Sequence, residues 1–365
     1  MYGRRSVDLN LLTIVTLLLA VGVLMVFSSS FVRAQQSLGD PYYYLKRQVF
    51  WLLIGAAGMV TVMQIQYWHW RALARPLLLA TVLALVLVLV PGIGEEAYGS
   101  RRWIGLGPIG FQPSEMAKLV LIIYFAHYFA RSQPVIGRLV PVFVTFFGIL
   151  GLVFGLIMLQ PDLGTAVTIG GTSVVMLFVA GARIAHLVAL GLSGVPLLAY
   201  LIFSEDYRRR RFFAFLEPEA DPLGSGYHII QSLYALGSGG LFGVGFFEGR
   251  QKFYYLPAQH TDFIYAVLGE ELGFVGTLAV LILFAAFAWR GYRVAVAAPD
   301  VFGSLLATGL TTMIVLQGVI NIGVVTASLP ITGISLPFIS YGGSSLVFSM
   351  VAVGILLNIS KYTRI

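Results

Sequence analysis

The chain has 365 residues, of which 58% are hydrophobic and only 11% are charged. Soluble domains carry about 25% charged residues, so this composition excludes a soluble globular protein and indicates an integral membrane protein. Cysteine is absent, which excludes disulfides, thiolate nucleophiles and cysteine-ligated metals, and the net charge of +7 fits membrane topology and anionic lipid better than nucleic acid.

Apolar segments alternate with polar or proline- and glycine-rich breaks along the whole chain. A bilayer is crossed by about 20 helical residues, so we expect each apolar segment to form a transmembrane helix. The segments lie near residues 8–30, 48–66, 74–91, 113–131, 139–159, 162–181, 184–203, 263–289, 301–327 and 341–360. The expected fold class is therefore an all-α polytopic membrane protein of about ten transmembrane helices. The first segment lacks a cleavage site and is expected to be a retained span.

Basic residues gather at one set of segment ends. An even number of spans places both termini on one side of the membrane, where the short segments carry eleven basic residues and two acidic ones. The basic residues are Arg4, Arg5, Arg71, Arg75, Arg131, Arg138, Arg183, Arg290, Arg293, Lys361 and Arg364, and the acids are Asp8 and Asp300. Because basic short loops face the cytoplasm, the sequence predicts cytoplasmic termini.

One polar insertion, residues 204–262, separates the seventh and eighth spans. It holds the run Arg208–Arg211, which suits a lipid headgroup or a solvated face, and eight glycines between Gly224 and Gly249. An unstructured loop of this length is unusual, so we expect short helices within it. On the predicted topology it is a large extracytoplasmic loop inside a single transmembrane domain that covers residues 1–365.

The stretch QPSEMAK at the start of the fourth span contains a proline, an acid and a base. Pro113 suits a first helical turn, and Glu115 and Lys118 are three residues apart, so they can pair on one helix face. Two interpretations remain open. The residues form an ion pair near the membrane surface, or Lys118 presents its ammonium to a lipid pyrophosphate while Glu115 orients it.

Polar residues of three other segments also need an interpretation. Arg101 and Arg102 can bind the same phosphates or anchor their loop at the membrane interface. Asp162, in QPDLGTA, is expected to cap the helix that follows it. Gln317 and Asn321 are four residues apart in the ninth span, which favours hydrogen bonds between helices.

Asp262, in the stretch LPAQHTDF, stands at the start of the eighth span. Its position alone favours a helix N-cap. Capping does not require the basic and aromatic residues before it, among them Lys252 and His260. The alternative is a general base, a carboxylate at the membrane edge that accepts a proton from a sugar hydroxyl, worth about 10²–10⁴-fold in rate.

Glu270 and Glu271 follow inside the same apolar segment. On an unbroken helix Glu270 lies about 12 Å further along than Asp262 and about 80° around the axis, while Glu271 faces nearly the opposite way. The three carboxylates therefore cannot share one face. We expect Glu271 to lie near the membrane interface, and the role of Glu270 stays open.

Several nucleotide and metal motifs are missing from the sequence. It contains no GxxxxGK[ST] phosphate loop, no GxGxxG after a strand and no HExxH or histidine cluster. No cofactor is therefore evident, and a divalent cation is neither indicated nor excluded.

Five stretches together resemble one known family. In chain order they are QPSEMAK, QPDLGTA, GSGYHIIQSLYALGSGG, QKFYYLPAQHTDFIYAVLGEELGFVG and LPITGISLPFISYGGSS. Together with the ten spans they are similar to the SEDS family (shape, elongation, division and sporulation), and to its rod-shape elongation members more than to its division members. The family's essential aspartate falls on Asp262, and the Glu and Lys of its fourth span fall on Glu115 and Lys118. Ala258 stands where the family often has a second acid.

The resemblance implies a peptidoglycan glycosyltransferase of the bacterial inner membrane that polymerises lipid II at the outer face during cell elongation, with a class B penicillin-binding protein as partner. It implies an inverting transfer with Asp262 as base and undecaprenyl pyrophosphate as leaving group. The candidate substrate-binding residues are Glu115, Lys118, Arg101, Arg102, Lys252 and His260. The alternatives are a lipid II flippase and a scaffold without catalytic activity. A flippase commonly has repeats and polar or broken helices at the midplane, whereas here the ionisable residues crowd the outer ends of the spans.

Overall fold

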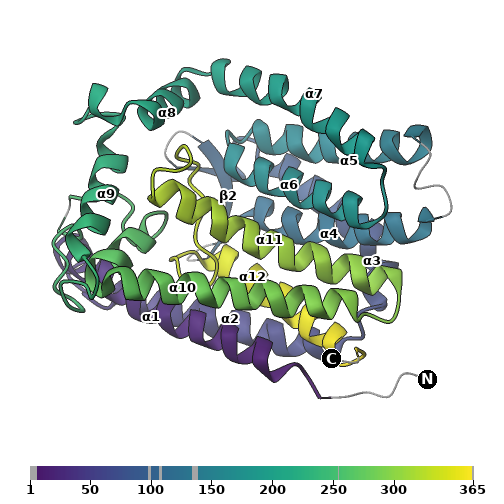
Figure 1. Ribbon diagram of the computed structural model, residues 1–365, viewed down its shortest axis with the longest axis horizontal. Helices are drawn as coiled ribbons and strands as arrows, with labels where there is room; N and C mark the ends of the chain where they lie inside the picture. The colour runs from purple at the N-terminus through teal and green to yellow at the C-terminus, as the bar shows by residue number, and fades with distance from the viewer. Residues whose placement is uncertain (1–5, 98–99, 107–108, 134–138, 254, 364–365) are drawn as a thin grey trace.

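A computed structural model describes residues 6–97, 100–106, 109–133, 139–253 and 255–363 (Figure 1). Helices stand at each predicted span: α1 (Leu9–Leu38), α2 (Tyr43–Gln64), α3 (His69–Leu87), α4 (Pro113–Arg131), α5 (Leu139–Met158), α6 (Leu163–Val179), α7 (Ile184–Phe203), α10 (Ile264–Val296), α11 (Val301–Val325) and α12 (Gly343–Ser360). Within the described residues, α1, α2, α3, α7, α10, α11 and α12 are each long and apolar enough to cross a membrane, and α5 and α6 contribute shorter apolar helices. The predicted helical polytopic fold is confirmed.

The centre of the bundle is formed by α11 and α12. In their most apolar stretches 78% and 72% of the residues are buried, whereas none of the residues described in the apolar stretch of α7 is buried. α12 packs on α2, and α11 packs on α10, α6 and α4. α7 runs along the edge of the bundle (Figure 1) and exposes large apolar side chains such as Leu192 and Tyr200, as expected of a lipid-facing helix.

The two ends of the described chain meet at one end of the bundle. The amide N–H of Asp8 donates to Ser360 Oγ at 3.1 Å, and the Asp8 carboxylate caps α1 and pairs with Arg290 near the end of α10 at 2.6 Å. An even number of crossings produces this arrangement. Four basic residues of the topology prediction, Arg4, Arg5, Arg138 and Arg364, lie outside the described residues.

A small antiparallel sheet forms in the loop before α4. Its strands are β1 (Gly94–Ala97), β2 (Ser100–Leu106) and β3 (Ile109–Phe111), in the order β1-β2-β3. Ser344 Oγ of α12 donates to the carbonyl oxygen of Gly110 and accepts from the amide N–H of Gln112, both at 3.2 Å. The sheet therefore ties the start of α4 to the start of α12.

The long insertion contains short helices, as predicted. They are α8 (Asp206–Leu216), the 3-10 turn η2 (Pro218–Ala220) and α9 (Tyr227–Gly239), and turns follow from residue 240 to the start of α10. α9 packs on α10 and α11, and Ser232 Oγ donates to the carbonyl oxygen of Val325 at 2.7 Å. The segment is thus attached to the bundle along its second half.

α10 is not the unbroken helix that the sequence predicts. Gly273 has φ 66° and ψ −163°, outside the helical region, in a conformation open to glycine because it has no Cβ. The Tyr265 hydroxyl donates to the carbonyl oxygen of Thr277 at 3.1 Å, although twelve residues of straight helix span about 18 Å. Residues 264–272 therefore bend back beside the rest of α10. The break follows Glu270 and Glu271, so the expected spacing between Asp262 and Glu270 is not affected by it.

Candidate active site

A partly open cavity of about 220 Å³ lies beside the start of α4, the start of α6 and the residues that precede α10. Its ionisable lining consists of Arg102, Glu115, Lys118, Asp162 and Asp262. These residues come from β2, α4, the N-cap of α6 and the end of the long insertion. Sequence positions up to 160 residues apart thus meet in one space.

The backbone that carries Asp262 is held at three consecutive carbonyl oxygens. His260 accepts from the amide N–H of Tyr341 at 2.9 Å, Thr261 accepts from Ser340 Oγ at 2.6 Å, and Asp262 accepts from Asn321 Nδ2 at 2.7 Å. The N-cap position of α10 is occupied by Phe263, without a side-chain capping bond. The capping interpretation of Asp262 is therefore wrong, and its carboxylate faces the cavity.

Desolvation is the main influence on the Asp262 carboxylate. The side chain is half-buried at the cavity wall yet lies deep in the protein, and this burial raises its pKa from 3.8 to about 6. The cations of Arg211 and Arg102 oppose the rise, and the Asp162 carboxylate adds to it. The group is thus mainly ionised at neutral pH but is a stronger base than an ordinary aspartate.

Glu115 and Lys118 form the predicted pair inside the cavity. Their side chains are buried and the Lys118 ammonium lies 2.9 Å from the Glu115 carboxylate. Pro113 stands in the first turn of α4, as predicted, and Glu115 lies in the same turn, where the helix dipole favours an acid. The pair is therefore not at an exposed surface, and one charged ligand group in the cavity can contact the Lys118 ammonium without bulk water between them.

Asp162 has the capping role that the sequence predicts, but it also lines the cavity. Its carboxylate accepts from the Thr165 amide at 3.1 Å and from Thr165 Oγ1 at 2.8 Å. Arg102 donates to the carbonyl oxygens of Gln160 and Pro161 in the turn before it. From the sequence alone, only the structural role of this turn is expected. Its place beside Asp262 depends on the packing of α6 against α11 and was not visible in the spacing.

Three of the predicted substrate-binding residues do not line this cavity. Arg101 and Arg102 are neighbours on β2, and of the two only Arg102 lines the cavity. Lys252 is buried in an ion pair with Glu271 at 2.7 Å. His260 is the third.

His260 is enclosed by aromatic rings. Its ring centroid lies 4.6 Å from that of Tyr44 and 5.7 Å from that of Tyr341. Desolvation lowers its pKa to about 4, and the charge of Arg33 adds to this effect. The ring is therefore neutral at neutral pH and does not offer a cation to a phosphate. It packs against Tyr44 and Tyr341, and the backbone carbonyl of the same residue, His260, accepts from the Tyr341 amide.

Asn321, one of the two amides predicted to bond between helices, holds two backbone segments of the cavity wall. Asn321 Nδ2 donates to the carbonyl oxygens of Asp262 and Ile334, both at 2.7 Å. Gly333, beside Ile334, has φ 75°, and a Cβ at this position would lie 3.7 Å from Asp262 Oδ2. Asn321 thus joins the segment before α10 to the segment before α12 next to the Asp262 carboxylate.

We expect Asn321→Leu to lower the free energy of unfolding by about 1–3 kcal/mol for each carbonyl that loses its donor in a buried site. Thermal unfolding in detergent measures this loss. Thr326→Val is the matched control, because the exposed Thr326 hydroxyl bonds only to its own helix and to Ser328. Equal melting temperatures for Asn321→Leu and wild type would show that the amide does not hold this junction.

A second, much smaller space lies on another side of Lys118. It measures about 10 Å³, about the space of a single water molecule, and is lined by apolar side chains such as Ile122 and Met313 and by Thr168, Thr172 and Ser173. Within the described residues no group of three His, Cys, Asp or Glu side chains is placed to hold a metal ion. The cavity therefore offers three carboxylates, an ammonium and a guanidinium around one space.

Comparison with known proteins gives consistent matches over the whole chain. The model of the family described as cell cycle protein, FtsW/RodA/SpoVE, matches residues 8–365. Stage V sporulation protein E of Bacillus subtilis is 49% identical over 361 residues, which cover 99% of both chains. A probable peptidoglycan glycosyltransferase FtsW of Trichlorobacter lovleyi is 45% identical over 353 residues, covering 97% of this chain and 93% of that one.

Solved structures match the fold equally fully. A chain from a structure described as a peptidoglycan synthase complex that coordinates polymerization and crosslinking has a TM-score of 0.79 and 33% identity, with 97% of both chains covered. The crystal structure of the rod shape determining protein RodA of Thermus thermophilus has a TM-score of 0.71 and 31% identity, covering 97% of this chain and 96% of that one.

Proposed function

The chain belongs to the FtsW/RodA/SpoVE family of cell cycle proteins, and from this premise we propose that it is a peptidoglycan glycosyltransferase that polymerises lipid II into glycan strands. The relatives named as probable peptidoglycan glycosyltransferases support this activity. In the structure, the observation that supports this function most directly is that the Asp262 carboxylate, with its raised pKa, lines the same cavity as the Lys118 ammonium.

The chemistry assigned to the cavity is an inverting glycosyl transfer. The C4 hydroxyl oxygen of an acceptor N-acetylglucosamine attacks C1 of a donor N-acetylmuramic acid, and Asp262 takes the hydroxyl proton as the new bond forms. The bond from C1 to the pyrophosphate oxygen breaks, and undecaprenyl pyrophosphate leaves with the electron pair. Lys118 and Arg102 offset the charge that develops on the leaving group, and Glu115 holds the Lys118 ammonium in place.

The position of the charged residues favours this reaction over lipid transport. A flippase needs a polar route through the bilayer, whereas the charged side chains of the cavity stand on β2, at the starts of α4 and α6 and just before α10, and the space next to Lys118 is only about 10 Å³. A scaffold without activity has no need for a desolvated carboxylate beside a buried ammonium, which are costly to retain. Both alternatives predict that a purified protein makes no glycan.

Topology, partner and cellular role extend the proposal. We place both termini in the cytoplasm on the basis of the arginine distribution, so that the cavity faces the outer side of the bacterial inner membrane. A class B penicillin-binding protein that crosslinks the product is the proposed partner, supported by the match to a chain of a peptidoglycan synthase complex. Elongation is the cellular process that we propose. The relatives at 44–49% identity are named for stage V sporulation and for FtsW. Complementation of elongation, division and sporulation mutants would show which of these processes the protein serves.

The decisive experiment supplies lipid II to the purified protein and its partner in detergent, where no movement across a bilayer is needed. Polymerised glycan, separated by gel electrophoresis after the crosslinking activity has been blocked, supports the enzyme. A partner preparation alone is the control for polymerase activity in the partner. If the pair makes no glycan although the substrate and the complex are intact, transport or scaffolding takes the place of this proposal.

The raised pKa of Asp262 predicts a pH limit for the reaction. The base must be ionised, so the rate should fall about tenfold per pH unit below about pH 6. Arg211 lowers this pKa, and Arg211→Gln should therefore shift the limit to higher pH. Arg209→Gln is the control, because its guanidinium is exposed and paired with Asp206. A rate that stays constant down to pH 4 would exclude Asp262 as the titrating base.

A further inference from the structure

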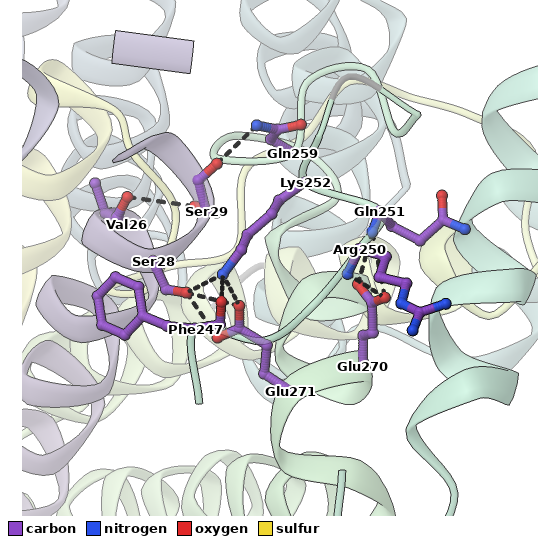
Figure 2. A network of polar contacts seen from close by, with 10 residues as sticks. All are labelled: Val26, Ser28, Ser29, Phe247, Arg250, Gln251, Lys252, Gln259, Glu270 and Glu271. Carbon is purple, nitrogen blue, oxygen red and sulfur yellow. Dashed lines mark hydrogen bonds and ion pairs between the residues drawn. The ribbon is translucent and has the colours of Figure 1, made fainter. Parts of the chain in front are cut away.

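A buried charged network lies outside the cavity, in the part of the molecule drawn in Figure 2. Lys252 Nζ lies 2.7 Å from Glu271 Oε1, and the two side chains are 2% and 0% exposed. Lys252 comes from the turns that precede Asp262, and Glu271 comes from the segment of α10 that follows it. The ion pair therefore joins the two flanks of Asp262.

Both charged groups of this pair also have hydrogen-bond partners. Lys252 Nζ also donates to the carbonyl oxygen of Phe247 at 2.6 Å and to Ser28 Oγ at 3.2 Å, and Ser28 Oγ donates to the Glu271 carboxylate at 2.6 Å. Phe247 has φ 69°, a left-handed conformation that is unfavourable for a side chain of this size. Burial of two charges is costly and strain adds to the cost, so the arrangement is not explained by stability alone.

The second glutamate binds the backbone of the same turns. The Glu270 carboxylate accepts from the amide N–H of Arg250 at 2.7 Å and from that of Gln251 at 3.1 Å. The carbonyl oxygens of Glu270 and Glu271 accept from the amides of Val244 and Gly245 at 2.9 and 3.2 Å. Residues 244–252 and 264–272 are therefore clamped together by charges and by backbone bonds, next to the break at Gly273.

The clamp connects to the catalytic segment through α1. Ser28 bonds to Glu271, and the carbonyl oxygen of the next residue, Ser29, accepts from Gln259 Nε2 at 2.7 Å (Figure 2). Gln259 stands three residues before Asp262 and directly before the run of carbonyls that Tyr341, Ser340 and Asn321 hold. α1 thus supports both the ion pair and the start of the segment that carries the carboxylate.

We propose that Lys252 and Glu271 are positioning residues for glycosyl transfer, which fix the Asp262 carboxylate against the acceptor hydroxyl by clamping both flanks of Asp262 to α1. This inference rests on the proposed function. It replaces the expectation that Lys252 binds substrate, and it gives the two glutamates of α10 a role that periodicity did not supply. Neither side chain of the ion pair contacts the substrate cavity.

The test compares single, double and conservative variants in the lipid II assay with the partner present. Lys252→Met and Glu271→Gln should each lower kcat about 10²-fold, since small misplacement of a reacting group is sufficient, while KM changes little because Glu115 and Lys118 are untouched. The double variant Lys252→Met with Glu271→Gln should recover the melting temperature, since no unpaired charge remains, but not kcat. Lys252→Arg, which can still bridge the two flanks, should recover part of kcat.

A structural readout accompanies the kinetics. Amide hydrogen exchange of residues 255–263 should be faster in the two single variants and in the double variant than in wild type. The matched control is Asp8→Asn, which breaks the Asp8–Arg290 ion pair at the other end of the bundle and should leave this exchange and kcat unchanged.

Recovery of kcat together with the melting temperature in the double variant would overturn the positioning role and leave a purely structural ion pair. Wild-type kcat in both single variants would overturn it as well. If Asp262→Asn still polymerises lipid II in the same assay, the proposed function of Asp262 as the base is wrong, which is a separate outcome from failure of the clamp. In that case, amide exchange at residues 255–263 still shows whether Lys252 and Glu271 hold this segment in place.

Discussion

Asp262→Asn is expected to reduce lipid II polymerisation by about 10²–10⁴-fold, the range that general-base catalysis contributes. The amide keeps the size of the side chain and the three backbone bonds at residues 260–262, but it cannot accept the hydroxyl proton. KM should change little, because the cations of the cavity remain. The measurement is the steady-state rate of glycan formation by the purified complex at several lipid II concentrations.

Loss of folding does not account for this expected result. Burial raises the folded-state pKa of Asp262 above that of the unfolded chain, so the folded protein binds the proton more tightly between about pH 4 and pH 6. Stability therefore falls as the pH rises through that window, and a neutral amide avoids this loss. The melting temperature of Asp262→Asn at pH 7 should equal or exceed that of wild type.

The matched control for a lost carboxylate is Asp206→Asn. Asp206 belongs to the same long insertion, and its exposed side chain pairs with Arg209 at 2.8 Å without facing the cavity. Its rate should match wild type. If Asp262→Asn polymerises as fast as Asp206→Asn, another group takes the proton and the proposed mechanism is wrong.

Lys118→Gln is expected to have the second largest effect, a loss of about 10²–10³-fold in kcat. This is the range for removal of one group that stabilises developing charge in a site shielded from water. The variant also leaves Glu115 buried without its cation, which costs about 3–5 kcal/mol of stability. Activity and thermal unfolding must therefore be measured on the same preparation.

The double variant Glu115→Gln with Lys118→Gln separates the two effects. Its amides can still bond to one another, so the melting temperature should return towards that of wild type, whereas the rate should stay low because no cation meets the leaving pyrophosphate. Lys118→Arg keeps a charge near the same place and should retain more activity than either. A double variant with wild-type kcat would limit the pair to a structural role.

The positions of the helices were predictable because the bilayer imposes a length and an apolar composition that are written locally in the sequence. Helices begin or end within a few residues of the expected spans, and the acid at the N-cap of α6 and the proline in the first turn of α4 behave as local rules require. The sheet at residues 94–111 was missed because its strands are short and give no sustained alternation of polar and apolar residues. The break at Gly273 was missed because one glycine in an apolar run is compatible with either a helix or a turn.

The candidate site was predictable only in part. Asp262, Glu115 and Lys118 were identified, and the structure brings them into one cavity. Arg101, Lys252 and His260 are close to them in sequence, yet they do not line the cavity. Lys252 pairs with Glu271, and His260 packs against the Tyr44 and Tyr341 rings. Asp162 was assigned to structure and lines the cavity as well.

By itself the sequence determined that the chain lies in a membrane, where its helices run and which residue types carry charge at their ends, because these properties depend on local composition. Tertiary structure decided the partner of each charge. Lys252 meets Glu271 and Ser28, which lie 19 and 224 residues away. The backbone carbonyl of Asp262, by contrast, is held by Asn321, 59 residues away. A buried charge is stable only with a partner at hydrogen-bond distance, and the packing of distant helices sets that distance.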